Sequence, residues 1–348
     1  MNPYVLTTML MGLGIGTTMT FASSHWLLAW MGLEINTLSI IPLMTLPHHP
    51  RAVEAATKYF LIQATAAAVI LFASVTNAWF TGQWEILQMS HPVPLVLVTL
   101  ALALKIGLAP LHSWLPEVLQ GLTLTTGLVL STWQKLAPFA ILLQIQHSTP
   151  HIMIILGLLS ILVGGWGGLN QTQLRKILAY SSIAHLGWMA LVLQFYPTLA
   201  LLALALYLVM TFTAFYILNV MKSTNINSLA ISWAKFPILS ALTPLVLLSL
   251  AGLPPLTGFM PKWLIIQEVT KQGLPATATI SALSALLSLY FYLRLSYAMT
   301  LTMSPNNLAS FAPWRLPPIQ TALPLAFTIL LTLFLLPLTP SITAVLTR

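Results

Sequence analysis

Charge is scarce in this sequence, and aspartate is missing altogether. Only 5% of the 348 residues are charged and 58% are hydrophobic, whereas a soluble globular chain carries about 25% charged residues. Most of the surface is therefore expected to face lipid rather than water. Backbone polar groups in lipid must be satisfied internally, which leaves helices or a closed barrel. Because the apolar runs are long and do not alternate, we predict an all-α polytopic membrane protein.

Cysteine is also absent, which excludes disulfides, cysteine-bound iron–sulfur clusters and thiolate chemistry. The net charge is +8, but the basic residues are scattered and form no patch, which excludes a nucleic-acid-binding protein. The first ten residues, MNPYVLTTML, lack the basic segment and cleavage site of a signal peptide and are expected to begin the first helix.

Apolar stretches of roughly 20 residues, the length that crosses a bilayer, recur along the whole chain. We count about eleven such stretches, with boundaries uncertain by about 2–4 residues. The predicted transmembrane helices lie near 3–21, 25–45, 53–79, 93–119, 124–145, 150–170, 174–195, 197–222, 238–271, 274–301 and 321–345.

The fourth and ninth predicted helices are too long for one straight crossing, and each contains helix breakers near its middle. The fourth includes KIGLAPLHSWLPE from Lys105, and the ninth includes AGLPPLTGFMPKW from Ala251. Proline removes a helical hydrogen bond and clashes with the preceding turn, and broken backbone at membrane depth needs protein or a polar cavity around it. Proline and glycine are common in membrane helices, which is the competing interpretation, but the matching positions favour a transport pathway.

The positions of the two breaks also predict an internal repeat. Residues 1–147 and 148–302 are expected to be two copies of one five-helix unit, each with one broken helix, and 303–348 to form a C-terminal helix. A repeat with an odd number of helices reverses its direction in the membrane, so the two copies are expected to be inverted. All three parts belong to a single membrane domain.

Basic residues in the loops predict the orientation. The face that carries more Lys and Arg is the matrix or cytoplasmic face by the positive-inside rule. The opposite face carries mainly Lys271 and Arg348. The N-terminus is therefore expected on the first face and the C-terminus on the other. The basic residues of the first face are Arg51, Arg175, Lys176, Lys222, Lys235 and Arg315.

Four charged residues are candidates for function by their depth in the predicted helices, because a charge at the bilayer centre costs about 2.5–3.5 kcal/mol. Glu34 lies roughly 14 Å into the second helix, Lys105 roughly 18 Å into the fourth, and Lys135 roughly 16 Å into the fifth, at 1.5 Å per residue. Lys262 follows the break in the ninth helix. Such residues are expected to be functional; the competing interpretation is that each lysine reaches an interface with its long side chain.

Proton transfer is the chemistry that suits these four residues. Burial disfavours the charged form of a lysine, and a nearby carboxylate favours it. We expect Glu34 to pair with Lys105 and set its affinity for protons, Lys135 to take the proton onward, and Lys262 to serve the second half. His112, inside the first break, and His185 are possible relays because histidine titrates near neutrality, although a lone histidine is often only a hydrogen-bonded core residue.

The other acidic residues receive structural interpretations. Glu54 and Lys58 are four residues apart with the acid first, the spacing of an interfacial helix ion pair. Glu85 is expected to be solvated in its loop. Glu117 follows Trp114, Leu115 and Pro116 of the first break, where a role in capping or orienting the break and a purely structural role are both open.

Three motifs resemble the antiporter-like subunits of respiratory complex I and the related cation/proton antiporters. They are ALKIGLAPLHSWLPEV at 103–118, LAYSSIAHLGW at 178–188 and SLAGLPPLTGFMPKW at 249–263. The resemblance covers essentially the whole chain. It implies two inverted five-helix repeats and proton translocation driven by redox chemistry elsewhere in the complex. It also places the family's midplane acid on Glu34, its broken-helix lysine on Lys105, its relay lysine on Lys135 and its exit-half lysine on Lys262.

The same resemblance implies the setting of the chain. Its location would be the mitochondrial inner membrane, with the N-terminus on the matrix side and the C-terminus on the intermembrane-space side. Its partners would be the other membrane and supernumerary subunits of complex I and the membrane lipids. The resemblance implies no cofactor in this chain, with NADH, flavin, iron–sulfur clusters and ubiquinone chemistry on other subunits. Many relatives have Asp where Glu117 stands and His where Leu119 stands, so no role is transferred to Leu119 and the role of Glu117 stays open.

Two alternatives remain at this point. A free-standing secondary cation/proton antiporter would use the same charges but would work alone. A structural subunit with a vestigial proton path would use none of them, although an idle buried charge is costly.

Overall fold

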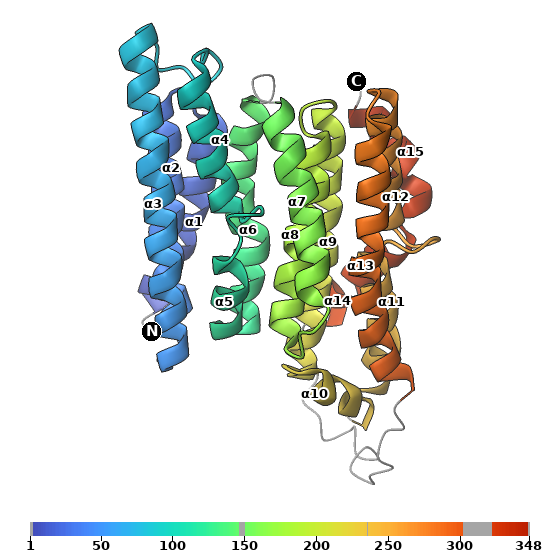
Figure 1. Ribbon diagram of the computed structural model, residues 1–348. Helices are drawn as coiled ribbons and strands as arrows, with labels where there is room; N and C mark the ends of the chain where they lie inside the picture. The colour runs from blue at the N-terminus through green and yellow to red at the C-terminus, as the bar shows by residue number, and fades with distance from the viewer. Residues whose placement is uncertain (1–2, 146–149, 235, 302–321, 347–348) are drawn as a thin grey trace. The chain divides into compact units, whose positions relative to one another are not determined.

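The computed structural model describes residues 3–145, 150–234, 236–301 and 322–346, and within them the chain is helical with no β-strand (Figure 1). Its compact units are Met1–Ser160 and Ile161–Arg348. The first unit holds α1 Pro3–Ala22, α2 Trp26–Thr45, α3 Pro50–Thr81, α4 Pro92–Ile106, α5 Trp114–Gly121, α6 Leu124–Gln144 and the start of α7 Pro150–Gly168. The second holds the rest of α7, then α8 Leu174–Val192, α9 Pro197–Met221, α10 Ile226–Ile231, η1 Ser232–Ala234, α11 Pro237–Ala251, α12 Phe259–Lys271, α13 Pro275–Thr300, α14 Ala322–Phe334, η4 Leu336–Leu338 and α15 Thr339–Leu346.

The helix boundaries follow from local chemistry. Proline stands in the first turn of α3, α4, α9, α11 and α13. The N–H groups of the first turn have no partner within the helix, so the N–H that proline lacks is not needed there. Apolar side chains continue each run until a glycine, a polar cluster or another proline ends it. The predicted helix positions are confirmed to within a few residues wherever the structure describes them.

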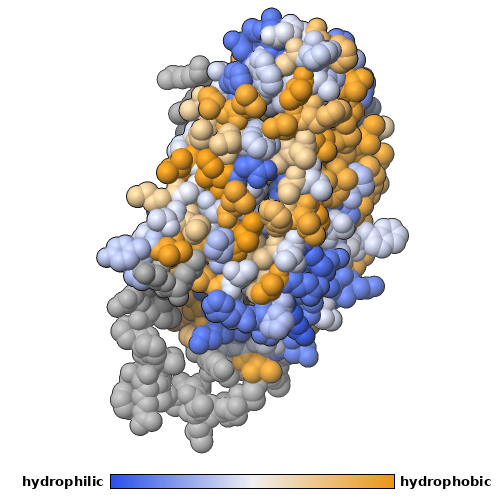
Figure 2. Space-filling view, turned by 90° about the vertical axis from the view of Figure 1, so that its left-hand side faces the viewer, coloured by the Kyte–Doolittle hydropathy of each residue, from blue (hydrophilic) through white to orange (hydrophobic). Residues whose placement is uncertain are grey.

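Seven of the described helices are long and apolar enough to cross a membrane, and α14 with α15 would make an eighth if the bent pair is one span. The expected single C-terminal helix is wrong in detail, because α14 and α15 meet at an angle of 66°. Pro337 lies between them and cannot donate a backbone hydrogen bond to the preceding turn. Figure 2 shows one face of the protein with apolar residues across its middle and hydrophilic residues gathered toward both ends.

Both predicted helix breaks are present. The fourth predicted helix is the pair α4 and α5, and the ninth is the pair α11 and α12. Each first helix ends at a glycine with left-handed backbone, Gly107 at φ 90° and Gly252 at φ 83°. In each case the glycine N–H bonds to the carbonyl four residues back and the next N–H to the carbonyl five residues back, which closes the helix end in a way that favours glycine.

The two breaks also share their sequence pattern. GLAPLHSWLPE at 107–117 and GLPPLTGFMPK at 252–262 match at one glycine, two leucines and two prolines when they are offset by 145 residues. Under this offset Trp114 corresponds to Phe259, and Glu117 corresponds to Lys262. The breaks are therefore two versions of one backbone device with different side chains.

A second local feature occurs once in each unit. An isolated antiparallel bridge joins His25 to Glu85 in the first unit and Gln173 to Asn225 in the second. The hydrogen bonds have the same pattern: the residue after each bridge residue donates to the carbonyl just before the bridge partner. The first bridge joins the loop before α2 to the loop before α4, and the second joins the loop before α8 to the loop before α10, a short helix that sequence patterns did not predict.

Candidate functional site

A small polar cavity lies inside the first unit and is walled by α2, α3, α4, α5 and α6. It leaves about 10 Å³ for the centre of a water molecule, which is the room that about one water needs. Two lysines, three amide side chains and two aromatic rings face it together with apolar groups. The lining residues are Leu33, Asn36, Thr37, Tyr59, Gln63, Lys105, Ile106, Trp114, Leu130, Gln134, Lys135, Ala137 and Pro138.

Lys105 lies in the last turn of α4, just before the break. Its side chain is buried, with only 6% of the residue exposed. Its Nζ has no hydrogen-bond partner among the described residues, and no ion pair within 4.0 Å joins it to a described acid. A buried amine without a protein partner is costly, so this position is not explained by packing.

Lys135 lies in α6, is 3% exposed, and lines the same cavity as Lys105. The structure therefore brings together two lysines that are thirty residues apart in the sequence. Pro138, one turn further along α6, also lines the cavity. A proline inside a helix leaves a carbonyl of the preceding turn without its usual donor.

Glu34 lies in α2 and is half-buried. Its carboxylate accepts a hydrogen bond from Thr37 Oγ1 at 3.1 Å. The expected direct pair with Lys105 is not formed, because no described ion pair within 4.0 Å involves Glu34. Glu34 itself does not line the cavity, but its neighbours in α2, Leu33, Asn36 and Thr37, do.

Lys262 lies in α12 of the second unit, after the break, and is 9% exposed. Its Nζ donates to the carbonyl oxygen of Ala251, the last residue of α11, at 2.7 Å. The C-terminal end of a helix carries partial negative charge, which stabilises a cation there. A Cβ on Gly252 would lie 3.1 Å from this Nζ, so the glycine leaves the space that the amine occupies.

The two candidate histidines lie in different environments. His112 is half-buried inside the first break, and its Nδ1 is 3.2 Å from the carbonyl oxygen of Pro110; it does not line the cavity. His185 is buried in α8, and its ring centroid lies 5.7 Å from that of Tyr207. Within the described part of the chain, histidines and acids form no group of three or more that could hold a metal ion.

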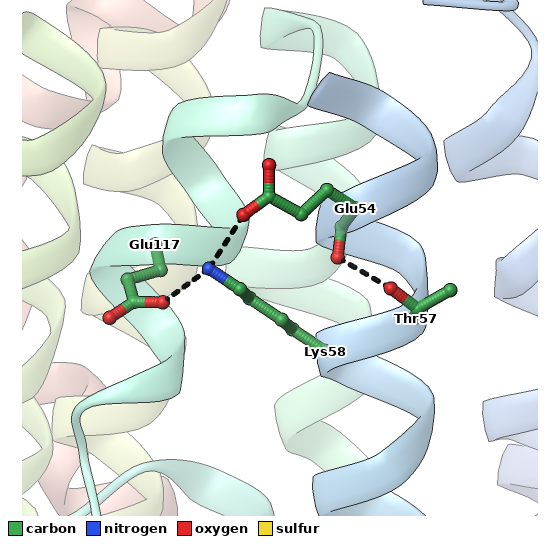
Figure 3. A network of polar contacts seen from close by, with 4 residues as sticks. All are labelled: Glu54, Thr57, Lys58 and Glu117. Carbon is green, nitrogen blue, oxygen red and sulfur yellow. Dashed lines mark hydrogen bonds and ion pairs between the residues drawn. The ribbon is translucent and has the colours of Figure 1, made fainter. Parts of the chain in front are cut away.

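An ion-pair network joins the second half of the first broken helix to α3 (Figure 3). Lys58 Nζ lies 2.8 Å from Glu54 Oε1 and 2.8 Å from Glu117 Oε2. The predicted helix pair between Glu54 and Lys58 is confirmed, and Glu117 is found to bind the same lysine from α5. Beside it, Tyr59 packs edge-on against Trp114 with centroids 5.8 Å apart, so the network adjoins two rings that wall the cavity.

Uncharged polar residues complete the site, and sequence patterns did not single them out. Gln63 Nε2 donates to the Lys105 carbonyl at 3.4 Å, and Gln134 Nε2 donates to the Asn36 carbonyl at 3.2 Å. Trp114 Nε1 donates to the Leu104 carbonyl at 3.0 Å, near the C-terminal end of α4. The sequence signal that could have found the amides is an Asn or Gln inside an apolar helix. In a lipid environment such a side chain needs a hydrogen-bond partner within the protein.

Family models match almost the whole chain. Residues 23–288 match the model described as NADH:quinone oxidoreductase/Mrp antiporter, TM. Residues 289–343 match the model for the NADH dehydrogenase subunit 2 C-terminus.

Named relatives are similar over their full length. NADH-ubiquinone oxidoreductase chain 2 of Tetraodon nigroviridis is 70% identical over 342 residues, which cover 98% of both chains. The protein of the same name in Salmo salar is 68% identical over 348 residues, which cover 100% of both.

Solved structures share the fold. A chain of respiratory complex I from Thermus thermophilus has a TM-score of 0.80 and 30% identity, covering 96% of this chain and 80% of that one. A chain of an archaeal membrane-bound sulfane sulfur reductase has a TM-score of 0.86 at 18% identity, covering 97% and 74% of the two chains, and shows the fold alone. The chain therefore belongs to the family of NADH:quinone oxidoreductase and Mrp antiporter transmembrane subunits, and within it to the NADH-ubiquinone oxidoreductase chain 2 proteins.

Proposed function

We propose that this chain moves protons across the membrane as a subunit of complex I, and that its buried amines carry them. Membership of the family supports a membrane subunit involved in proton translocation in complex I. The observation that carries the residue assignment is the pair of buried lysines, Lys105 and Lys135, that face one polar cavity. A structural subunit would gain nothing from two buried amines at one cavity.

The first half of the path runs from Lys105 to Lys135. The negative potential of Glu34 favours the protonated form of Lys105, and loss of that potential releases the proton. The proton then passes through the cavity to the neutral amine of Lys135. Lys262 serves as the proton site of the second half, with His185 as a relay there and His112 as a possible relay at the first break.

We also propose the expected layout of about eleven transmembrane segments, in which two inverted five-helix repeats, 1–147 and 148–302, precede a C-terminal segment within 303–348 that is bent between α14 and α15. Two observations support a repeat: the breaks share a sequence pattern at an offset of 145 residues, and the bridges share one hydrogen-bond pattern. An odd number of helices per repeat inverts the second copy.

The setting follows from the relatives and from the loop charges. We propose the mitochondrial inner membrane, with the N-terminus on the matrix side and the C-terminus on the intermembrane-space side. Three of the charges used for this orientation, Lys235, Arg315 and Arg348, lie outside the described residues. The partners are other membrane and supernumerary complex I subunits and lipids. The whole complex is a proton-translocating NADH:ubiquinone reductase. NADH is oxidised and ubiquinone is reduced on its other subunits, which hold the flavin and the iron–sulfur clusters.

Substitution of the acid and of the first amine tests the proposal. Glu34→Gln and Lys105→Met should each lower proton pumping in proteoliposomes that contain the assembled complex, while the amount of complex stays unchanged. Glu85→Gln is the matched control, because Glu85 is exposed in a loop. Normal pumping by both test variants would show that these residues carry no proton.

The free-standing antiporter is the alternative to exclude. The purified chain in liposomes should then exchange Na⁺ or K⁺ for protons. Our proposal predicts no exchange by the chain alone and pumping only by the complex.

A further inference from the structure

Thr257 in the second break has a buried side chain that the proton path described above does not use. The residue is 1% exposed. Its Oγ1 donates a hydrogen bond to the carbonyl oxygen of Thr332 in α14 at 2.5 Å, across 75 residues of sequence. The bond therefore joins the irregular backbone of the break to the C-terminal segment, which is residues 322–346 with α14, η4 and α15.

The carbonyl that accepts this bond lies where α14 ends. Thr332 is the third residue from the C-terminal end of the helix, and the last four carbonyls of a helix have no partner within it. Pro337 and the 66° bend follow, so the helix does not continue past these carbonyls. A carbonyl in lipid must be satisfied within the protein, and the Thr257 hydroxyl does this for Thr332.

Thr257 also fixes the start of α12. Its own carbonyl accepts a hydrogen bond from the N–H of Met260 at 3.2 Å, and α12 begins at Phe259. Lys262, the fourth residue of this helix, donates to the Ala251 carbonyl. One residue thus binds α14 through its side chain and α12 through its backbone, so movement of Thr257 would move the helix that carries Lys262.

The two breaks differ at this position. Under the offset of 145 residues Thr257 corresponds to His112, whose described contact is local, with Nδ1 3.2 Å from the Pro110 carbonyl oxygen of the same break. Thr257 and Thr332 also lie in the ranges that the two different family models match. The hydrogen bond therefore joins the antiporter-like part of the chain to the part typical of chain 2.

We infer that the Thr257–Thr332 hydrogen bond holds the second break against the C-terminal segment, and that it thereby positions Lys262 for proton transfer. Only the second statement rests on the proposed function. Thr257 is a positioning residue, because it exchanges no proton and acts through the helix on which the amine stands. Without the bond, α12 is free to shift, and Lys262 Nζ loses its fixed place at the Ala251 carbonyl.

Thr257→Val in the assembled complex tests the first statement, because valine has nearly the shape of threonine and lacks the hydroxyl. Amide hydrogen exchange over residues 257–262 should become about tenfold faster, the factor that one ordinary hydrogen bond contributes to local opening. Thr257→Ser keeps the hydroxyl and should exchange at the native rate.

Thr332→Val is the matched control for this exchange measurement. Thr332 is also 1% exposed, and its hydroxyl donates to the Ile329 carbonyl within α14. The change therefore removes a buried hydroxyl but leaves the carbonyl that Thr257 binds. Equal exchange over residues 257–262 in Thr257→Val and Thr332→Val would overturn the inference.

The ratio of protons pumped to electrons transferred, measured in proteoliposomes, tests the second statement. We expect the ratio to fall in Thr257→Val and to be restored in Thr257→Ser. A native ratio in Thr257→Val despite faster exchange would show that the bond does not position Lys262, as would a ratio that serine fails to restore. If Lys262→Met keeps the native ratio, the proposed function of Lys262 fails, while the exchange rates still decide whether Thr257 holds the break.

Discussion

The two helix breaks use one backbone design for two different chemical arrangements. Both begin at a left-handed glycine, Gly107 or Gly252, and both run for seven residues before the next helix. In the first break the buried amine precedes the glycine, and its Nζ has no partner among the described residues. In the second the buried amine follows the break and binds the end of the preceding helix.

Different side chains donate hydrogen bonds to the two helix ends. Near the end of α4, the Leu104 carbonyl accepts a hydrogen bond from Trp114 Nε1. At the end of α11 the Ala251 carbonyl accepts from Lys262, and the residue corresponding to Trp114 is Phe259, whose side chain has no polar atom. The comparison teaches that the side chain bound to the end of the first helix is an indole in the first break and an amine in the second, so the second amine also has a structural task.

The largest expected effect concerns close packing in the second break. A Cβ on Gly258 would overlap the backbone carbonyl oxygen of Ser249, whereas the corresponding first-break residue is Ser113. Gly258→Ser should therefore prevent stable assembly, because overpacking against backbone costs about 1–3 kcal/mol or more. Ser113→Gly should assemble normally, and native gels of membranes that carry each variant measure the amount of complex. Equal assembly of both variants would show that the breaks do not differ in packing.

Replacement of the two break lysines by methionine should affect stability in different ways. Lys262→Met removes a charged hydrogen bond and should cost about 1.5–3 kcal/mol. Lys105→Met removes a buried amine that has no described partner, so stability should be unchanged or higher. Thermal unfolding of the assembled complex, followed by protease sensitivity of this chain, measures both. A larger loss for Lys105→Met than for Lys262→Met would contradict the assignment of the structural task to Lys262.

Exchange of the aromatic residue should give a smaller effect. Trp114→Phe gives the first break the aromatic residue of the second and removes the bond to the Leu104 carbonyl, at a cost of about 1 kcal/mol. The same protease assay measures this cost. The reciprocal change Phe259→Trp is the control for ring size, and an equal loss in both variants would point to packing rather than to the hydrogen bond.

The smallest effect is expected at the exposed network of Lys58. Lys58→Met breaks the pair between α3 and α5 and should lower the stability only slightly, and less at high salt, because exposed ion pairs are screened by water and ions. Glu54→Gln removes only the pair within α3 and leaves the bond from Lys58 to Glu117. In the protease assay we expect Lys58→Met to lose more stability than Glu54→Gln, and we expect this loss to shrink as salt is added. A larger loss of stability in Glu54→Gln would show that the pair between Lys58 and Glu117 does not hold α5.

The sequence predicted the positions of the helices and both breaks, because long apolar runs and clustered Pro and Gly are local signals. It also predicted Lys105, Lys135 and Lys262 as buried charges, since their depth follows from distance along a helix. The contacts between helices were not predictable in this way. Gln134 meets Asn36 from a helix 98 residues away, and Glu117 meets Lys58 across 59 residues, separations over which local patterns carry no information.

The ratio of protons pumped to electrons transferred tests the central claim most directly, because it separates proton carriage from the rate of redox chemistry. It should be measured for the complex with Lys105→Met and, as a control, with Lys271→Met, whose side chain is exposed. The proposal predicts a lower ratio for Lys105→Met and an unchanged ratio for Lys271→Met. An unchanged ratio in an assembled Lys105→Met complex would contradict the claim that the buried amine at the first break carries protons.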